Sequence, residues 1–276
     1  MRILITFRPE KKIFLLPINY NYEISSMIYH IMSLSGPKFT KWLHSRGFSL
    51  DGTKRFKFFN FSRLFFKEKE VQRDVIKASG NFRMLFSSPI DESVVTNFIA
   101  GMMENNDGFY IGNRDVGIRV KVANVKILPY PNFKQHTKYI MLSPTVATQQ
   151  DENKKVQYLS PNDIKVYDVL RKNLVHKYEI LYQEKCPYEI NFEFDENYMA
   201  HANNLDDLMK LVTIKTGKEN TAKIKGFLLP ITIIANPKIQ KLVYETGLGE
   251  KNSLGFGMLE VAKGQENLAF SKLPAK

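Results

Sequence analysis

The sequence has one cysteine in 276 residues, Cys186, and no apolar run approaches the roughly 18 residues that a membrane-spanning helix needs. A single cysteine excludes an internal disulfide and any zinc site built on cysteine pairs. The opening MRILITFRPEKK reaches Arg8 after a few apolar residues, which is too short a stretch for a secretory signal. We therefore expect a cytoplasmic protein without a membrane partner.

Acidic residues are also scarce. Asp and Glu number 28 against 40 Lys and Arg, which leaves a net charge of +12. Such a surplus favours an anionic partner, of which nucleic acid is the commonest. Hydrophobic residues make up 43% of the chain, an ordinary value for a packed core. At about 150 residues a domain, the length predicts about two domains.

Metal-site signatures are absent as well. The sequence contains no HExxH motif, no Cys–His cluster and no pair of histidines at the spacing of a facial triad. The five histidines are His30, His44, His136, His176 and His201. We expect neither a metal site nor a cofactor.

The first half of the chain shows the periodicity of a mixed α and β unit. Residues 1–7 alternate as a strand does, and apolar residues at 24, 27, 28 and 31 follow helical spacing. Gly36-Pro37 ends that helix and begins a second one. Aromatic-rich strands are predicted over 56–66 and 82–86, a helix over 91–103 and a strand over 117–128. If the two short helices count as one, this is the ferredoxin-like order βαββαβ.

The second half can be interpreted in the same way. The sequence predicts strands over 138–142, 188–194 and 255–261, helices over 163–182 and 237–245, strand-like residues over 222–235 and a short strand over 210–215. Pro129 and Pro131 interrupt pairing between the halves. The fold class that we predict is α+β, with two tandem ferredoxin-like (RRM-like) domains over 1–128 and 129–276.

A glycine-rich segment near the end of the chain is the most distinctive motif. Four glycines fall within eleven residues, and glycine lets backbone amides approach a ligand closely. Lys251, Asn252 and Ser253 lie inside this loop and are suited to contact phosphate or sugar. From the residues alone, a purely structural turn is equally well supported. The dinucleotide and P-loop patterns both fail, because Asn252 stands where either would need another residue.

This segment, GLGEKNSLGFGMLEV, resembles the C-terminal motif of the CRISPR repeat-processing endoribonucleases of the RAMP superfamily. The segment SSMIYHIMSLSGPKFTKWLHSRGF resembles the N-terminal helix pair of that family, and MRILITF and YIMLSPTVAT also fit. The resemblance implies two ferredoxin-like domains, an antiviral defence role and metal-independent cleavage of CRISPR repeat RNA. The cleavage would leave a 2′,3′-cyclic phosphate and a 5′-hydroxyl. The implied partners are repeat RNA and other CRISPR effector-complex subunits, with the protein itself a monomer or homodimer.

His44 is the strongest catalytic candidate. On a helix whose apolar stripe holds Phe39, Trp42 and Leu43, it points roughly 140° away from the buried face. A solvated surface histidine is the alternative, but the resemblance assigns His44 as the general acid or base. His30 is its rival. Of the other histidines, His176 falls in an amphipathic helix, and His136 and His201 match no motif.

The resemblance adds further site residues. Tyr29 matches the family's tyrosine, which orients the scissile phosphate or ribose, although a half-packed boundary aromatic is the alternative. Lys54 matches the supporting lysine, with Arg55 and Lys57 as rivals. For contact with RNA the resemblance implies the glycine-rich loop, namely Gly247, Gly249, Lys251, Asn252, Ser253, Gly255, Phe256 and Gly257. A non-catalytic CRISPR repeat RNA-binding subunit is the alternative function, and a general nucleic-acid chaperone is a third.

Overall fold

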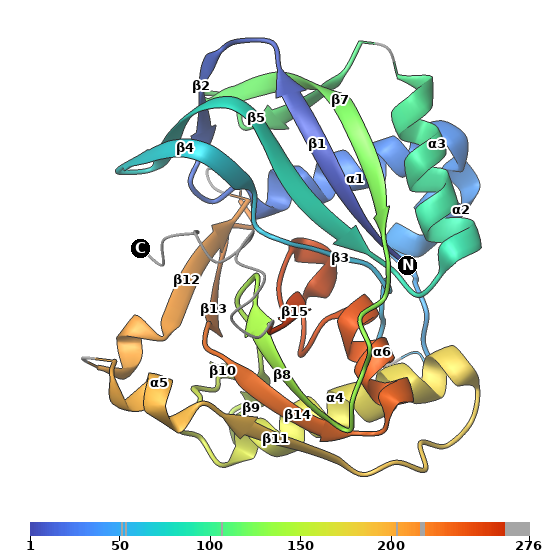
Figure 1. Ribbon diagram of the computed structural model, residues 1–276, viewed down its shortest axis with the longest axis vertical. Coiled ribbons are helices and arrows are strands. Elements are labelled where there is room, and N and C mark those ends of the chain that lie inside the picture. The colour runs from blue at the N-terminus through green and yellow to red at the C-terminus, as the bar shows by residue number, and fades with distance from the viewer. Residues whose placement is uncertain (51, 53, 106, 203, 216–218, 263–276) are drawn as a thin grey trace.

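A computed structural model describes residues 1–276 except 51, 53, 106, 203, 216–218 and 263–276. The chain folds into two α+β units that lie one above the other in Figure 1, with the first half of the sequence in the upper unit. The elements of the first half are β1 (Arg2–Pro9), β2 (Ile13–Pro17), α1 (Asn21–Ser35), α2 (Pro37–Ser45), β3 (Asn60–Phe61), β4 (Phe65–Gln72), β5 (Val75–Ser87), a π-helical turn (Asp91–Val95), α3 (Thr96–Glu104), β6 (Phe109–Gly112) and β7 (Gly117–Leu128).

The upper sheet has the ferredoxin-like strand order. Strand β1 lies between β5 and β7, and β4 pairs with the other edge of β5, all antiparallel. Strands β2 and β6 extend the sheet. Helices α1, α2 and α3 lie together behind the sheet in Figure 1. The alternation of β1 explains this, because Ile3, Ile5 and Phe7 are each 0% exposed and belong to the same core as Ile24 and Ile28 of α1.

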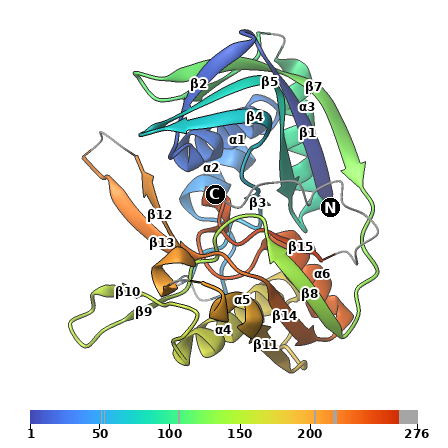
Figure 2. The same ribbon diagram turned by 60° about the vertical axis from the view of Figure 1, so that its left-hand side comes forward.

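The lower unit repeats this order. Its elements are β8 (His136–Met141), β9 (Thr148–Gln150), β10 (Val156–Tyr158), α4 (Lys165–Tyr182), β11 (Ile190–Phe194), α5 (Glu196–Ala200), a 3₁₀ turn (Leu205–Asp207), β12 (Met209–Ile214), β13 (Ala222–Phe227), β14 (Ile231–Ala235), α6 (Pro237–Thr246), a second 3₁₀ turn (Asn252–Leu254) and β15 (Leu259–Val261). The sheet runs β11-β14-β8-β15, again ferredoxin-like. The two-stranded ribbons β9–β10 and β12–β13 lie on one side of it (Figure 2).

The predicted fold class is confirmed, but two predicted strands differ from the structure. The aromatic segment 56–66 is mostly irregular, with a single bridge between Phe48 and Phe56, the two residues of β3 (Asn60 and Phe61) and the first two residues of β4 (Phe65 and Phe66). Its phenylalanines fill the core without alternating, since the adjacent residues Phe58 and Phe59 are both buried. The segment 222–235 forms two strands in different sheets, β13 and β14, separated by Pro230.

A buried arginine joins the two units. The side chain of Arg2, on β1, is 1% exposed and lies against the ring of Tyr244, with 3.4 Å between the guanidinium carbon and the ring centroid. It donates hydrogen bonds to the carbonyl oxygens of Tyr244 and Leu259 and pairs with Glu260 at 3.1 Å. These contacts fix the first strand of the upper unit to α6 and β15 of the lower one.

Candidate functional site

Tyr29 and His44 meet where α1 and α2 pack together. Tyr29 lies in the third turn of α1 and is half-buried, whereas His44 lies in the last turn of α2 and is exposed. Their rings meet edge to face, with centroids 4.9 Å apart and an angle of 83° between the planes. The structure thus brings together two of the residues predicted from sequence, and it leaves the imidazole open to solvent.

Two cations cap the end of α2, where the last carbonyls have no partners within the helix. The Lys57 ammonium donates to the carbonyl oxygens of Leu43 and His44, the latter at 2.8 Å. The Arg55 guanidinium donates to the carbonyl of Ser45 at 3.2 Å. Burial, and then the charge of Arg55, lowers the pKa of Lys57. The two rivals of Lys54 therefore hold the helix that carries His44.

Lys54 itself lies in a bend and is exposed. Its side chain lines a pocket together with those of Arg55 and Lys57.

The glycine-rich loop reaches the Tyr29 hydroxyl through Ser253. The Ser253 side chain hydrogen-bonds the Tyr29 hydroxyl, and the Phe59 ring packs edge-on against Tyr29 at 5.4 Å. Burial raises the pKa of Tyr29 well above its ordinary value. At neutral pH this hydroxyl is therefore protonated and serves as a hydrogen-bonding group, and it does not serve as a base.

Further hydrogen bonds fix the loop to α1. The Ser25 hydroxyl donates to the Ser253 carbonyl at 2.8 Å, and the Asn21 amide donates to the Leu254 carbonyl at 2.9 Å. The loop is thus held against the helix that carries Tyr29.

The glycines of this loop have a structural role. Gly247, Gly249, Gly255 and Gly257 all have positive φ and are buried. A Cβ on Gly257 would lie 1.9 Å from the Leu248 carbonyl oxygen, and one on Gly249 would lie 2.3 Å from that of Val146. Only glycine fits such approaches.

The buried part of the loop offers little to a ligand. The amides of Gly247, Gly255 and Gly257 bond to carbonyls inside the protein. The Phe256 side chain is 0% exposed and lies in a core cluster, so it does not reach a ligand. Of the loop residues predicted to contact RNA, Lys251, Asn252 and Ser253 line a pocket.

A buried lysine that the sequence analysis did not single out holds the loop from within. Lys177, on α4, is 1% exposed, and its ammonium donates to the carbonyls of Gly247 at 2.7 Å and Gly249 at 3.0 Å and to Oδ1 of Asn252 at 2.8 Å. Desolvation lowers the pKa of Lys177 to about 7, and the nearby Glu250 carboxylate opposes this shift. Its three donors are all used.

The signal for Lys177 is present in the sequence. Asn173 and Lys177 follow the same helical spacing as the buried residues Val166, Leu170 and Leu174. Polar residues on an apolar stripe are rarely buried without partners. That mismatch marks both residues as members of a site.

A pocket of 440 Å³ separates the 54–59 segment from the loop. As far as the chain is described, its lining carries five cationic side chains, those of Lys54, Arg55, Lys57, Lys177 and Lys251, and one carboxylate, that of Glu250. Phenylalanines 56, 58 and 59 and the Asn173 side chain complete the wall. The pocket is therefore suited to an anion that also carries an aromatic group.

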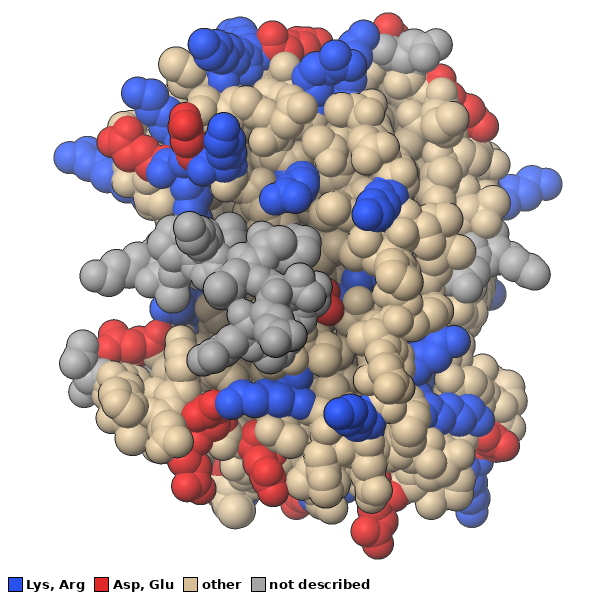
Figure 3. Space-filling model, in the orientation of Figure 1, with Lys and Arg blue, Asp and Glu red and all other residues tan. Residues whose placement is uncertain are grey.

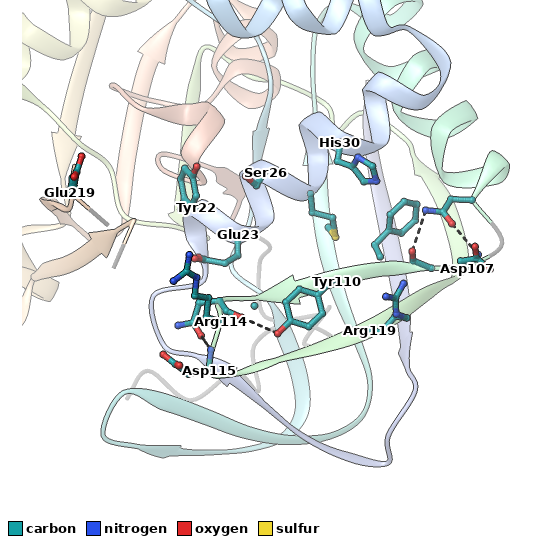
Figure 4. A pocket seen from close by; sticks show the side chains of 16 residues that line it. Tyr22, Glu23, Ser26, His30, Asp107, Tyr110, Arg114, Asp115, Arg119 and Glu219 are labelled. Carbon is teal, nitrogen blue, oxygen red and sulfur yellow. Dashed lines mark hydrogen bonds between the residues drawn. The ribbon is translucent and has the colours of Figure 1, made fainter. Parts of the chain in front are cut away.

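His30 points into a different and larger pocket of 1320 Å³, between α1 and the β6–β7 hairpin (Figure 4). Its ring packs edge-on against Phe109 at 6.5 Å. Arginines 114 and 119 in this pocket are outnumbered by Glu23, Asp107, Asp115 and Glu219. The charge of this pocket suits an anionic ligand less well.

Within the ranges that the structure describes, no group of three or more His, Cys, Asp or Glu side chains is placed to hold a metal ion. No helix of the described chain is long and apolar enough to span a membrane.

Comparisons with known proteins cover both halves of the chain. Residues 15–126 match the family "CRISPR-associated protein Cas6, N-terminal", and residues 128–261 match "CRISPR associated protein Cas6, C-terminal". The chain is 29% identical to the CRISPR-associated endoribonuclease Cas6 1 of Methanocaldococcus jannaschii, over 88% of this chain and 86% of that protein. It is 27% identical to the CRISPR-associated endoribonuclease Cas6 of Pyrococcus furiosus, over 98% of this chain and 97% of that protein. A solved structure, "CRISPR associated protein Cas6", superposes with a TM-score of 0.71 and 27% identity and covers 95% of this chain and 99% of its own.

Proposed function

Because the chain belongs to the Cas6 family of CRISPR-associated proteins, we propose that it is a metal-independent endoribonuclease that cleaves CRISPR repeat RNA to release guide RNAs. The observation that carries the proposal is the Tyr29–His44 pair, which includes an exposed imidazole and contacts two residues that line a cationic pocket, Phe59 and Lys57. The relatives named as endoribonucleases support the same activity.

The proposed reaction uses the RNA's own nucleophile. The ribose 2′-hydroxyl attacks the adjacent phosphorus while a base takes its proton, and the bond from phosphorus to the 5′-oxygen breaks as an acid protonates that oxygen. The products are a 2′,3′-cyclic phosphate and a 5′-hydroxyl. Histidine suits both proton transfers because its unperturbed pKa is near 6.5.

Each site residue has a separate role in this proposal. His44 is the general acid or base, placed by a helix end that Lys57 and Arg55 cap. The protonated Tyr29 hydroxyl, held by Ser253, orients the scissile phosphate or ribose. The exposed Lys54 ammonium stabilises the negative charge that grows on the phosphate. Lys251, Asn252 and Ser253 contact the RNA from the loop.

The open face of the upper sheet offers a second basic surface. Arg8, Arg83, Lys121 and Lys126 alternate along β1, β5 and β7 with residues that face the helices. Figure 3 shows Lys and Arg side chains over this part of the molecule. The face lies across the sheet from α1 and α2, so we propose that it contacts a more distant part of the RNA.

The wider setting is part of the same proposal. The protein would work in the cytoplasm, without a cofactor, as a monomer or homodimer, and other subunits of a CRISPR effector complex would receive its product. We place the domain boundary between residues 128 and 129, which is supported by the end of β7 at Leu128.

The test is cleavage of the cognate repeat RNA in EDTA by the parent protein and by His44→Ala, with His30→Ala as the matched control. Loss of a general acid or base is expected to slow cleavage about 10²- to 10⁴-fold, and His30→Ala should cleave at the parental rate. Undiminished cleavage by His44→Ala would remove His44 from the mechanism. RNA that remains whole under excess parent protein would instead indicate a non-catalytic RNA-binding subunit.

A further inference from the structure

The floor of the cationic pocket comes from α4, one turn of which carries both Asn173 and Lys177. Their spacing of four residues places the two side chains on one face of the helix. Both are buried, Asn173 at 6% exposure and Lys177 at 1%. Helix α4 thus supplies the pocket with two polar groups from inside the molecule.

The two groups differ in the hydrogen-bonding capacity that remains available to a ligand. The Lys177 ammonium spends all three hydrogens on the glycine-rich loop, so it fixes the pocket wall. The Asn173 Oδ1 is buried and accepts no hydrogen bond from the described residues. An orphaned buried acceptor is costly unless a ligand completes it. The Asn173 side chain lines the pocket, so a ligand there lies beside this acceptor.

The opposite wall offers an aromatic ring. Phe56 lines the pocket and is only partly buried, and its ring is stacked on that of Phe58, with centroids 5.8 Å apart and 19° between the planes. Aromatic side chains of this kind bind unpaired bases by stacking. The pocket volume of 440 Å³ falls within the roughly 300–1,000 Å³ of small-molecule sites.

We propose that this pocket is a subsite for one unpaired nucleobase of the RNA, at a nucleotide beside the scissile phosphate, with Asn173 as its hydrogen-bonding residue and Phe56 as its stacking surface. The inference rests on the proposed function. Every base carries an N–H donor for the Asn173 oxygen on its pairing edge. Lys54 and Lys251 at the same pocket suit the attached phosphates.

The position next to the cut follows from Ser253. This residue lines the pocket and interacts with the Tyr29 hydroxyl. Phe59 also lines the pocket, and its ring packs edge-on against that of Tyr29 with centroids 5.4 Å apart, so the subsite and the Tyr29–His44 pair share one wall. A base in the pocket therefore belongs to a nucleotide close to the one whose ribose reacts.

The experiment measures binding separately from cleavage. The RNA is a repeat with deoxyribose at the cut, and each of the three nucleotides on either side of the cut is replaced in turn by an abasic nucleotide. At one of these positions the parent protein should lose about 10-fold in affinity, the value of one stacked and hydrogen-bonded base. Asn173→Ala should bind the intact RNA about 3- to 10-fold more weakly and lose little more at that position.

Asn162→Ala, an exposed asparagine just before α4, is the control and should behave as the parent does. Equal losses for parent and Asn173→Ala at every position would overturn the subsite, as would a parent that is insensitive to all six removals. If Asn173→Ala does not fold, the same scan with Phe56→Leu decides the question by the same criterion. Cleavage of the all-ribose repeat in parallel reports on the proposed function, so the two failures are distinguishable.

Discussion

Tyr29 is held by contacts on three sides: the His44 ring, the Phe59 ring and the Ser253 hydroxyl. Its ring is fixed by packing and its hydroxyl by one hydrogen bond, so the two parts can be tested separately. The protonated hydroxyl is the only group that Tyr29→Phe removes.

Tyr29→Phe should therefore reduce the cleavage rate while RNA binding is retained. A hydrogen bond to a charged group contributes about 1.5–3 kcal/mol, or roughly 10- to 100-fold in rate. Single-turnover cleavage and the Kd for uncleavable RNA provide the two measurements. Tyr110→Phe, at the pocket that holds His30, is the control. A parental rate for Tyr29→Phe would refute a role for the hydroxyl.

Lys177 makes stability depend on pH. Its pKa is about 7 in the folded protein and near 10.4 when unfolded, so between these values the unfolded chain binds more protons. Stability must then rise with pH across this window, because the folded protein gives up a charge that is costly to bury. Below pH 7 the lysine is charged in both states and its burial cost is undiminished.

Urea unfolding of the parent and of Lys177→Met at pH 6, 8 and 9.5 measures this effect. The free energy of unfolding of the parent, minus that of the variant, should increase from pH 6 to 9.5, because all other titrating groups are shared. A constant difference, or one that falls with pH, would contradict a depressed pKa for this lysine.

The glycine-rich loop contacts both units at the site, since it is hydrogen-bonded to α1 of the upper unit and to Lys177 of the lower unit. Gly257→Ala puts a Cβ 1.9 Å from the Leu248 carbonyl oxygen at a φ of +74°. Gly80→Ala has a similar φ of +68° but meets nothing within 4 Å. The shared conformational cost cancels, so the difference reports the collision. Urea unfolding should show Gly257→Ala to be about 1–3 kcal/mol less stable than Gly80→Ala. Equal stabilities would show that the loop is not tightly packed.

Regular elements were predicted well because their signals are local. The alternation of residues 3, 5 and 7 and the stripe at 24, 27, 28 and 31 each reflect a single periodic element, and both elements form where predicted. Segment 56–66 was mispredicted as one strand because the adjacent Phe58 and Phe59 are both buried on irregular backbone, which divides the segment. The local sequence pattern does not show whether a buried phenylalanine lies on a strand or on irregular backbone.

The site shows the same division. The sequence indicated Tyr29, His44 and the glycine-rich loop. The structure brings these three together, although their roles in catalysis and RNA binding stay predictions. Lys177 was missed because its partners in the glycine-rich loop lie 70 to 75 residues further along the chain, and Asn173 because the pocket that it lines also includes that distant loop. Only the tertiary fold makes them neighbours.

At the scale of the whole molecule, Arg2 joins the two sheets. Arg2→Met would leave the carbonyl oxygens of Tyr244 and Leu259 without this donor inside the protein. The free energy of unfolding should fall by about 3 kcal/mol. Arg8→Met, on the same strand but exposed, should change it little. Urea denaturation of the full chain measures both, and equal effects would show that the interface does not depend on Arg2.

The central claim is that the RNA supplies its own nucleophile next to His44. It is tested most directly by one cleavage measurement in EDTA, on a repeat RNA and on the same RNA with deoxyribose just upstream of the cut. The account predicts that the first yields a 2′,3′-cyclic phosphate and a 5′-hydroxyl and that the second is not cut. Cleavage of the deoxyribose RNA at the same bond, or a product with a 5′-phosphate, would contradict it.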